Sequence, residues 1–144
     1  MLLNNRSCLN SKRIDLENQI RGTLKIFGLK IGKVTKAQYE PRIREMIKDD
    51  QELQCYIEPL LQSREMMVRQ VLVLEKQIRS MANSDDVCQR LMTIPGVGPI
   101  IALLYKATID NPYRFTRSNT LGVHLGLTPR KYASGEMDYD GHIT

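Results

Sequence analysis

The hydroxyl group of Ser134 could act as a nucleophile on a phosphate group. This serine is followed by Gly135, and a Ser-Gly pair ordinarily forms a turn. A serine hydroxyl attacks only when it is activated and when nearby groups stabilise the electrophile. Arg130 and Lys131 could supply positive charge beside a scissile phosphate, but the local sequence offers no general base. These residues define a candidate catalytic position without completing a catalytic site.

A second informative stretch is Ile94-Pro95-Gly96-Val97-Gly98-Pro99, which predicts a tight turn between two helices. Gly96 and Gly98 permit positive φ angles and a close approach to the backbone, and Pro99 suits the first turn of a helix. Ala102 is small enough for the two helices to pack closely. The stretch resembles the helix-hairpin-helix motif, whose backbone N–H groups hold a DNA phosphate without reading bases. The alternative is a plain turn between packed helices.

The helix before this hairpin must begin after a turn that the sequence places at residues 83–86. Ser84 or Asp85 is expected to cap that helix, because short polar side chains accept hydrogen bonds from the free N–H groups of a helix start. After this turn the composition changes, and five of the nine glycines fall in residues 91–135. We therefore predict a domain boundary here, with a C-terminal domain over residues 83–144.

Residues 51–82 carry the clearest periodicity in the chain. Steps of three and four join a stripe that is apolar except at Arg64: Leu53, Ile57, Leu60, Arg64, Met67, Val71, Leu74, Ile78 and Met81. A heptad pattern sustained over four repeats predicts a long coiled-coil helix or the arm of a helical hairpin. Pro59 is expected to kink this helix or to mark its start. Self-association through residues 53–81 and packing against the chain's own first helix are equally good interpretations.

Residues 1–50 form the predicted basic helical region. A first helix is expected over residues 11–27, from the helical spacing of Leu16, Ile20, Leu24 and Phe27. Ser11 is its predicted N-cap, and Gly28 is expected to end it. Thr35 is expected to cap a short helix over about residues 36–48, whose apolar side is formed by Ile43, Met46 and Ile47.

The positive charge of the chain is concentrated in this first region. Residues 1–48 carry eleven basic and four acidic side chains, residues 49–90 carry five and eight, and residues 91–144 carry five and four. A basic region favours a polyanion such as DNA or RNA as a partner, because phosphate contacts dominate nucleic-acid affinity. The alternative is an ordinary solvated helix surface.

Length and composition exclude several classes of protein. The 144 residues are 42% hydrophobic and 26% charged, which suits a folded domain rather than a disordered chain. The sequence contains no run of 18 apolar residues that would predict a transmembrane helix, and the first residues lack the apolar core of a secretory signal.

The three cysteines are widely spaced and form no metal-binding pair. They predict reduced thiols in a cytoplasmic protein. The predicted fold class is mainly α.

Three landmarks in order resemble the insertion-sequence transposases of the one-ten type, which are bridge-RNA-guided and combine a serine with four acidic DEDD metal ligands. The landmarks are residues 15–29, the hairpin at residues 94–99, and residues 125–136, which hold Leu-Gly-Leu-Thr-Pro-Arg and Ser-Gly-Glu. The last two are the more specific, and the resemblance spans nearly the whole chain. It implies that Gly96, Val97 and Gly98 are the hairpin residues that contact DNA and that Ser134 stands at the nucleophile position.

The resemblance also implies what the chain lacks. In that family an acidic domain precedes the coiled coil, whereas no strand-like segment with a buried acid precedes Asp15. The sequence stops at Thr144, within a stretch that continues in the family. We therefore expect a chain without the N-terminal acidic domain and the extreme C-terminus, which does not transpose DNA by itself. No cofactor or metal ligand is expected in it, because Mg²⁺ would belong to the acidic domain.

Three functions remain open from the sequence. The leading hypothesis is the DNA-binding portion of a transposase, inactive alone, with DNA and a guide RNA as partners. The second is a non-enzymatic helix-hairpin-helix module that binds DNA. The third is a coiled-coil interaction protein that forms homo-oligomers. The sequence leaves open whether the chain is itself an enzyme, and no membrane partner is expected.

Overall fold

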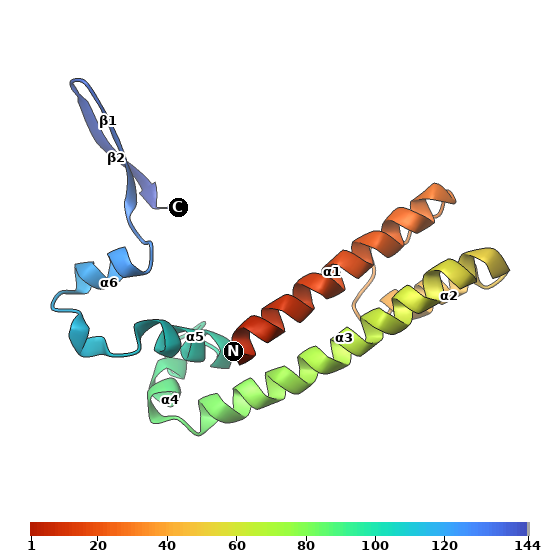
Figure 1. Ribbon diagram of the computed structural model, residues 1–144, viewed down its shortest axis with the longest axis horizontal. Coiled ribbons are helices and arrows are strands. Elements are labelled where there is room, and N and C mark those ends of the chain that lie inside the picture. The colour runs from red at the N-terminus through yellow and green to blue at the C-terminus, as the bar shows by residue number, and fades with distance from the viewer. Residues whose placement is uncertain (144) are drawn as a thin grey trace. The chain divides into compact units, whose positions relative to one another are not determined.

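The computed structural model describes residues 1–143, apart from the side chains of Ser118 and Asn119. Thr144, the last residue of the predicted C-terminal domain, lies outside the described residues. The elements in order are α1 (Leu2–Ile26), α2 (Tyr39–Ile47), α3 (Gln51–Asn83), α4 (Asp86–Met92), α5 (Pro99–Ile109), η1 (Pro112–Arg114), α6 (Ser118–His124), β1 (Pro129–Ser134) and β2 (Met137–Ile143) (Figure 1). The predicted mainly α class is confirmed.

The chain divides into two compact units, one over Met1–Lys106 and one from Ala107 to the C-terminal end. The first unit contains the three N-terminal helices and the hairpin at residues 94–99. The second contains α6 and the two antiparallel strands. This division leaves the proposed boundaries at residues 50 and 82 as predictions. Within the described residues, no helix is both long enough and apolar enough to cross a bilayer.

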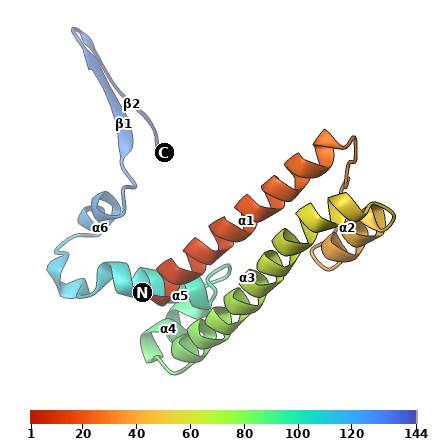
Figure 2. The same cartoon turned by 45° about the vertical axis from the view of Figure 1, so that its right-hand side comes forward.

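Helices α1 and α3 lie side by side and antiparallel in both views (Figures 1 and 2). Two ion pairs set their register: Arg6 Nη2 lies 2.6 Å from Glu75 Oε1, and Arg64 Nε lies 2.8 Å from Glu17 Oε1. The buried apolar side chains between them and α2 form one cluster, which includes Ile20, Leu24, Ile43, Ile47, Leu53, Ile57 and Leu61. The stripe of α3 therefore packs within its own chain.

The buried face of α3 drifts away from the predicted heptad positions at two points. Leu61 is fully buried where Leu60 was expected, and Ala82 is fully buried while Met81 is 49% exposed. An α-helix turns once every 3.6 residues, so a strict repeat of 3.5 residues moves off the buried face over several turns.

One alternative for Pro59 was that it marks the start of α3. This alternative is wrong, because the helix begins eight residues earlier, at Gln51. Asp50 caps it, and its carboxylate accepts a hydrogen bond from the Leu53 N–H at 2.9 Å. Proline has no N–H, so it leaves the Cys55 carbonyl without its usual helical partner. Cys55 is exposed, and water can therefore satisfy that carbonyl.

The prediction that Ser11 caps α1 is wrong, because the helix begins at Leu2. The ion pair of Arg6 with Glu75 holds the early turns of α1 against a part of α3 that is 69 positions away in sequence. The end of α1 agrees with the prediction. Gly28 has a φ of 75°, its N–H donates to the Lys25 carbonyl at 3.0 Å, and the Leu29 N–H donates to the Leu24 carbonyl at 2.9 Å. These bonds form a Schellman motif, which favours glycine.

Helix α2 is shorter than predicted and begins at Tyr39 rather than near residue 36. Thr35 does not cap it; instead, its carbonyl accepts a hydrogen bond from the Gln38 N–H at 3.2 Å in a preceding turn. The predicted apolar side is confirmed, since Ile43 and Ile47 are buried and Met46 is half-buried.

Arg64, the charged residue in the apolar stripe, is 4% exposed and lies where α1, α2 and α3 meet. Its guanidinium donates to Glu17 Oε1 at 2.8 Å and to Glu40 Oε1 at 2.5 Å, and it lies 4.6 Å from the centroid of the Tyr39 ring. The Tyr39 hydroxyl donates to the Glu17 carbonyl at 3.2 Å. A buried charge is tolerated when it is paired in this way.

Candidate functional site

The segment between α4 and α5 forms the tight turn that the sequence predicts. The Val97 N–H donates to the Ile94 carbonyl at 3.0 Å across Pro95 and Gly96. Gly96 has a φ of 86°, which agrees with a turn that needs a positive φ at its third residue. Pro95 at the second position also suits this turn.

Helix α5 starts directly after the turn, with its free N–H groups at the hairpin. The Ala102 N–H donates to the Gly98 carbonyl at 2.9 Å, which makes Gly98 the N-cap residue and Pro99 the first helical residue. Within the described residues, the N–H groups of Gly98, Ile100 and Ile101 have no acceptor. Unpaired N–H groups at the positive end of a helix dipole form an anion-binding arrangement.

A small apolar cluster holds the two helices of the hairpin together. Ala82, Cys88 and Ala102 are fully buried, and half-buried side chains pack against them: Leu91, Met92, Val97 and Leu103. The expectation that Ala102 allows close packing agrees with its full burial. Leu104 lies outside this cluster and is 53% exposed.

Asp85 fixes the start of α4 and its position relative to α5. Its carboxylate accepts a hydrogen bond from the Cys88 N–H at 2.9 Å, as a capping residue does, and pairs with the Lys106 ammonium group. The hydrogen bond from Lys106, followed by that from Cys88, lowers the pKa of Asp85 to about 2. Burial raises the pKa of the Cys88 thiol, so this cysteine is not an activated nucleophile.

Ser134, Arg130 and Lys131 lie on β1 in the second unit. Ser134 is the last residue of β1, pairs with Met137 across a two-residue turn, and is exposed. Gly135 in that turn has a φ of 58°, which suits glycine. Side chains alternate along a strand, so Lys131 and Ser134 lie on opposite faces of the β-hairpin, and the pairing register shifts between Pro129 and Lys131, where Arg130 lies. Lys131 pairs with Asp138 of β2 at 3.2 Å.

The geometry does not assemble a catalytic group around Ser134. Arg130 is four strand residues away, which is about 13 Å at roughly 3.3 Å per residue. Within the described residues, the Ser134 hydroxyl has no hydrogen-bond partner. The same residues hold no cluster of three or more His, Cys, Asp or Glu side chains that could bind a metal ion.

Tyr132 and Tyr139 stiffen this β-hairpin from opposite strands. Their rings are stacked with centroids 5.1 Å apart. A Cβ on Gly141 would lie 2.7 Å from Cε2 of Tyr132, so the strand needs glycine under that ring. Both strands remain exposed to solvent.

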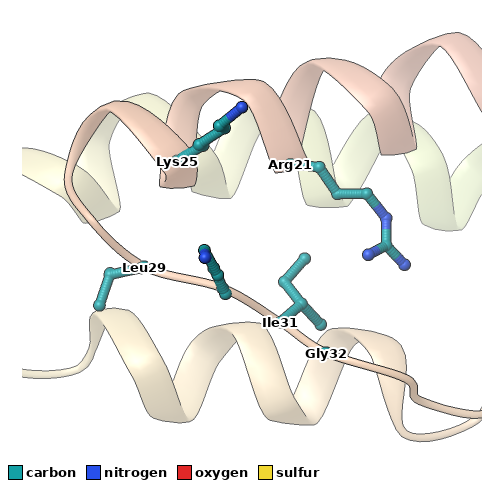
Figure 3. Close-up of a pocket in the computed structure, with 6 residues that line it drawn as sticks. Arg21, Lys25, Leu29, Ile31 and Gly32 are labelled. Atoms are coloured by element: carbon teal, nitrogen blue, oxygen red, sulfur yellow. The ribbon is translucent and has the colours of Figure 1, made fainter.

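One charged feature was not predicted as a site from the sequence. Arg21, Lys25 and Lys30 line a pocket of about 330 Å³ between the last turns of α1 and the connector to α2, together with Leu29, Ile31 and Gly32 (Figure 3). A signal for it was present, because residues 18–39 contain five basic side chains and no acidic one.

Comparisons with known proteins point to one family. Residues 88–144 match the family model described as the transposase IS116/IS110/IS902 family. The chain is similar to the transposase for insertion sequence element IS1111A of Coxiella burnetii, with 30% identity over 95% of this chain and 39% of the relative. It is also 29% identical to the transposase for insertion sequence element IS1328 of Yersinia enterocolitica, over 90% of this chain and 39% of that protein.

A probable family 20 transposase of Pseudomonas aeruginosa is 28% identical over 96% of the chain and 43% of that protein. The chain therefore spans about two-fifths of the length of these curated relatives. No solved structure shows a significant match to it.

Proposed function

Because the chain belongs to the IS116/IS110/IS902 transposase family, we propose that it is the portion of such a transposase that engages DNA. In this proposal the hairpin residues Gly96, Val97 and Gly98 hold a backbone phosphate. The contact fixes the position of the protein on DNA and does not read the base sequence.

The observation that carries this proposal is the set of unpaired N–H groups at the start of α5. Gly98, Ile100 and Ile101 lie within the stretch that matches the family model, and α5 is 11 residues long, so its dipole is well formed. Gly98 carries no side chain that would keep a phosphate away, and a Cβ built there meets nothing within 4 Å. Arg130 and Lys131 of β1 are assigned in this proposal to a separate DNA contact, made by the second unit, and Lys131 is partly neutralised there by Asp138.

The decisive experiment replaces Gly98 by Asp. Aspartate is a favoured N-cap residue, so Gly98→Asp should keep or raise the stability of the fold. The same carboxylate would occupy the free N–H groups and repel a phosphate, so affinity for a short DNA duplex should fall. Fluorescence anisotropy of a labelled random-sequence duplex at low salt measures the affinity, and urea denaturation measures the stability.

Gln70→Glu is the matched control, because it adds the same charge to an exposed position of α3. If both variants lose affinity equally, the hairpin is not the contact. Absence of binding by the unaltered chain at low salt would reject the DNA-binding role altogether, because phosphate contacts strengthen as salt falls. Binding should persist in EDTA, since the proposal gives the hairpin no Mg²⁺.

We propose that Ser134 occupies the nucleophile position of the whole transposase and that this chain does not rejoin DNA by itself. The support for inactivity is that the described residues place no base beside the hydroxyl. A strand-transfer assay with Mg²⁺ should therefore give no product. Product formation that Ser134→Ala abolishes would overturn the proposed inactivity.

Guide RNA and self-association complete the proposal. The family resemblance supports RNA as a partner. Helix α3 also exposes three apolar side chains, which favour a second copy of the chain as a further partner: Met66 at 66%, Leu72 at 60% and Val73 at 49%. Sedimentation should show oligomers that Leu72→Glu dissociates. A monomer at every practical concentration would remove self-association from the proposal.

A further inference from the structure

The pocket below the last turns of α1 has a positive lining that contains no acidic side chain. Figure 3 shows Arg21 reaching from α1 toward the connector near Ile31 and Gly32, with Lys25 one turn further along the helix. Lys30 lines the same pocket from the connector. Three basic residues from two segments therefore line one space of about 330 Å³.

These cations differ from most of the basic side chains nearby. Arg6 pairs with Glu75, Arg13 with Glu17, and Arg44 with Glu58. In contrast, Arg21, Lys25 and Lys30 make no ion pair with any carboxylate of the described residues, and neither do Lys33 and Lys36 further along the connector. Arg21 lies 5.5 Å from the centroid of the Tyr39 ring, which positions its guanidinium without neutralising it.

The fold holds the connector in place, so the cations are not on a loose loop. The Schellman motif turns the chain back at Gly28, and Leu29 packs against the apolar cluster of the first unit. Ile31 is buried in that cluster, and Gly32 has a φ of 74°. The backbone on both sides of Lys30 is therefore anchored.

We propose that this pocket binds a backbone phosphate of a nucleic-acid strand, with the exposed Lys33 of the same connector near a neighbouring phosphate. Arg21 would form paired hydrogen bonds with phosphate oxygens, and the lysines would act as point charges. Three basic residues at one pocket, with the exposed Lys33 on the same connector, fit a strand of phosphates better than one small anion. The site uses none of the hairpin residues, so it is a second and independent contact with nucleic acid.

The test removes two lysines that no described carboxylate neutralises. Lys25→Gln/Lys30→Gln is compared with Lys76→Gln/Arg79→Gln, which removes the same charge from exposed positions of α3. All four side chains are exposed, so both variants should melt as the unaltered chain does. Anisotropy of a labelled single-stranded RNA and of a labelled DNA duplex is measured over a salt series.

Each lost phosphate contact lowers the slope of log affinity against log salt by about 0.7 for a single strand and about 0.9 for duplex DNA. Because both lysines contact the one phosphate in the pocket, the pocket variant should lose up to about 0.7 on RNA or about 0.9 on the duplex, and the α3 variant much less. Equal losses in the two variants would overturn the proposal, as would unchanged binding by the pocket variant.

Polyglutamate serves as a competitor of different chemistry. If the pocket variant loses affinity for polyglutamate but not for nucleic acid, the site binds acidic protein and the proposal is wrong. The pocket effect should persist in the Gly98→Asp background, because the two sites share no residue. Loss of the hairpin effect with retention of the pocket effect would reject the hairpin contact and leave this proposal standing.

Discussion

Arg64 shows how a single residue can be recognised in the sequence while its role stays hidden. The sequence shows a charge in an apolar stripe, but the partners Glu17 and Glu40 come from α1 and α2, which are 47 and 24 positions away. No local pattern contains such a contact. The exceptional position could therefore be located from the sequence, whereas the three-helix junction and its ion pairs could not be predicted.

Replacing Arg64 should test how much this junction stabilises the fold. Arg64→Ala removes the buried guanidinium that Glu17 and Glu40 share and leaves them only their pairs with Arg13 and Arg44 on the outer side of the junction, which should lower the free energy of unfolding by about 2–3 kcal/mol. Arg69→Ala removes an exposed pair with Glu65 and should change it by less than about 0.5 kcal/mol. Urea denaturation of both variants gives the comparison, and equal small losses would show that the junction contributes little.

Asp85 gives the first unit a defined response to acid. Its folded pKa of about 2 is below the ordinary value of 3.8, so its stabilising contribution is present above 3.8 and is lost as pH falls toward 2. Asp85→Asn keeps the cap but removes the charge pair with Lys106. The unaltered chain should be more stable than this variant near neutral pH, and the difference should shrink between about pH 4 and pH 2.

Lys106→Gln is the companion variant for this test, since it removes the other half of the pair. In urea denaturation it should be less stable than the unaltered chain near neutral pH, and this difference in stability should also shrink between about pH 4 and pH 2. The double variant should then lose little more than either single variant. Losses that simply add would show that Asp85 and Lys106 act separately.

At the scale of elements, signals that lie within a few residues of one another predicted the structure well. Gly28 ends α1, Asp85 caps α4, and Ala102 packs between the helices of the hairpin. The start of α1 was missed because the ion pair with Glu75 and packing along α3 hold residues 2–10, and the local sequence does not show them. The pocket at Arg21 was missed although a local signal was present, because the run of basic residues does not show which of them lie around one space after the chain turns back at Gly28.

The end of α1 can be tested with one substitution at two glycines. Gly28 is in the left-handed region, so Gly28→Ala should lower the free energy of unfolding by about 1–2 kcal/mol. Gly22 is inside α1 and a Cβ there meets nothing within 4 Å, so Gly22→Ala should raise it by about 0.5–1 kcal/mol. Opposite shifts of the thermal midpoint are expected, and shifts of one sign would contradict the assigned cap.

At the scale of the whole molecule, the buried apolar clusters belong to the first unit. Every member of both clusters precedes residue 107. The β-hairpin of the second unit is exposed on both faces, and an isolated two-stranded hairpin is marginally stable. Stability of the chain should therefore reside in residues 1–106.

A shortened chain that ends at Asp110 tests this distribution. It keeps both apolar clusters and the whole of α5, so its helical circular dichroism and main thermal midpoint should match those of the full chain. A clearly lower midpoint would mean that residues beyond Asp110 contribute to the stability of the first unit. The same chain should retain the RNA and DNA contacts at Lys25 and Lys30.

The antiparallel pairing of α1 with α3 also governs how fast the molecule folds. Helices form within about a microsecond, whereas contacts between distant residues must wait for the chain between them to close. Arg64 meets Glu17 across 47 positions, and Arg6 meets Glu75 across 69. The docking of α1 on α3, rather than the winding of either helix, should therefore be the slow step of folding.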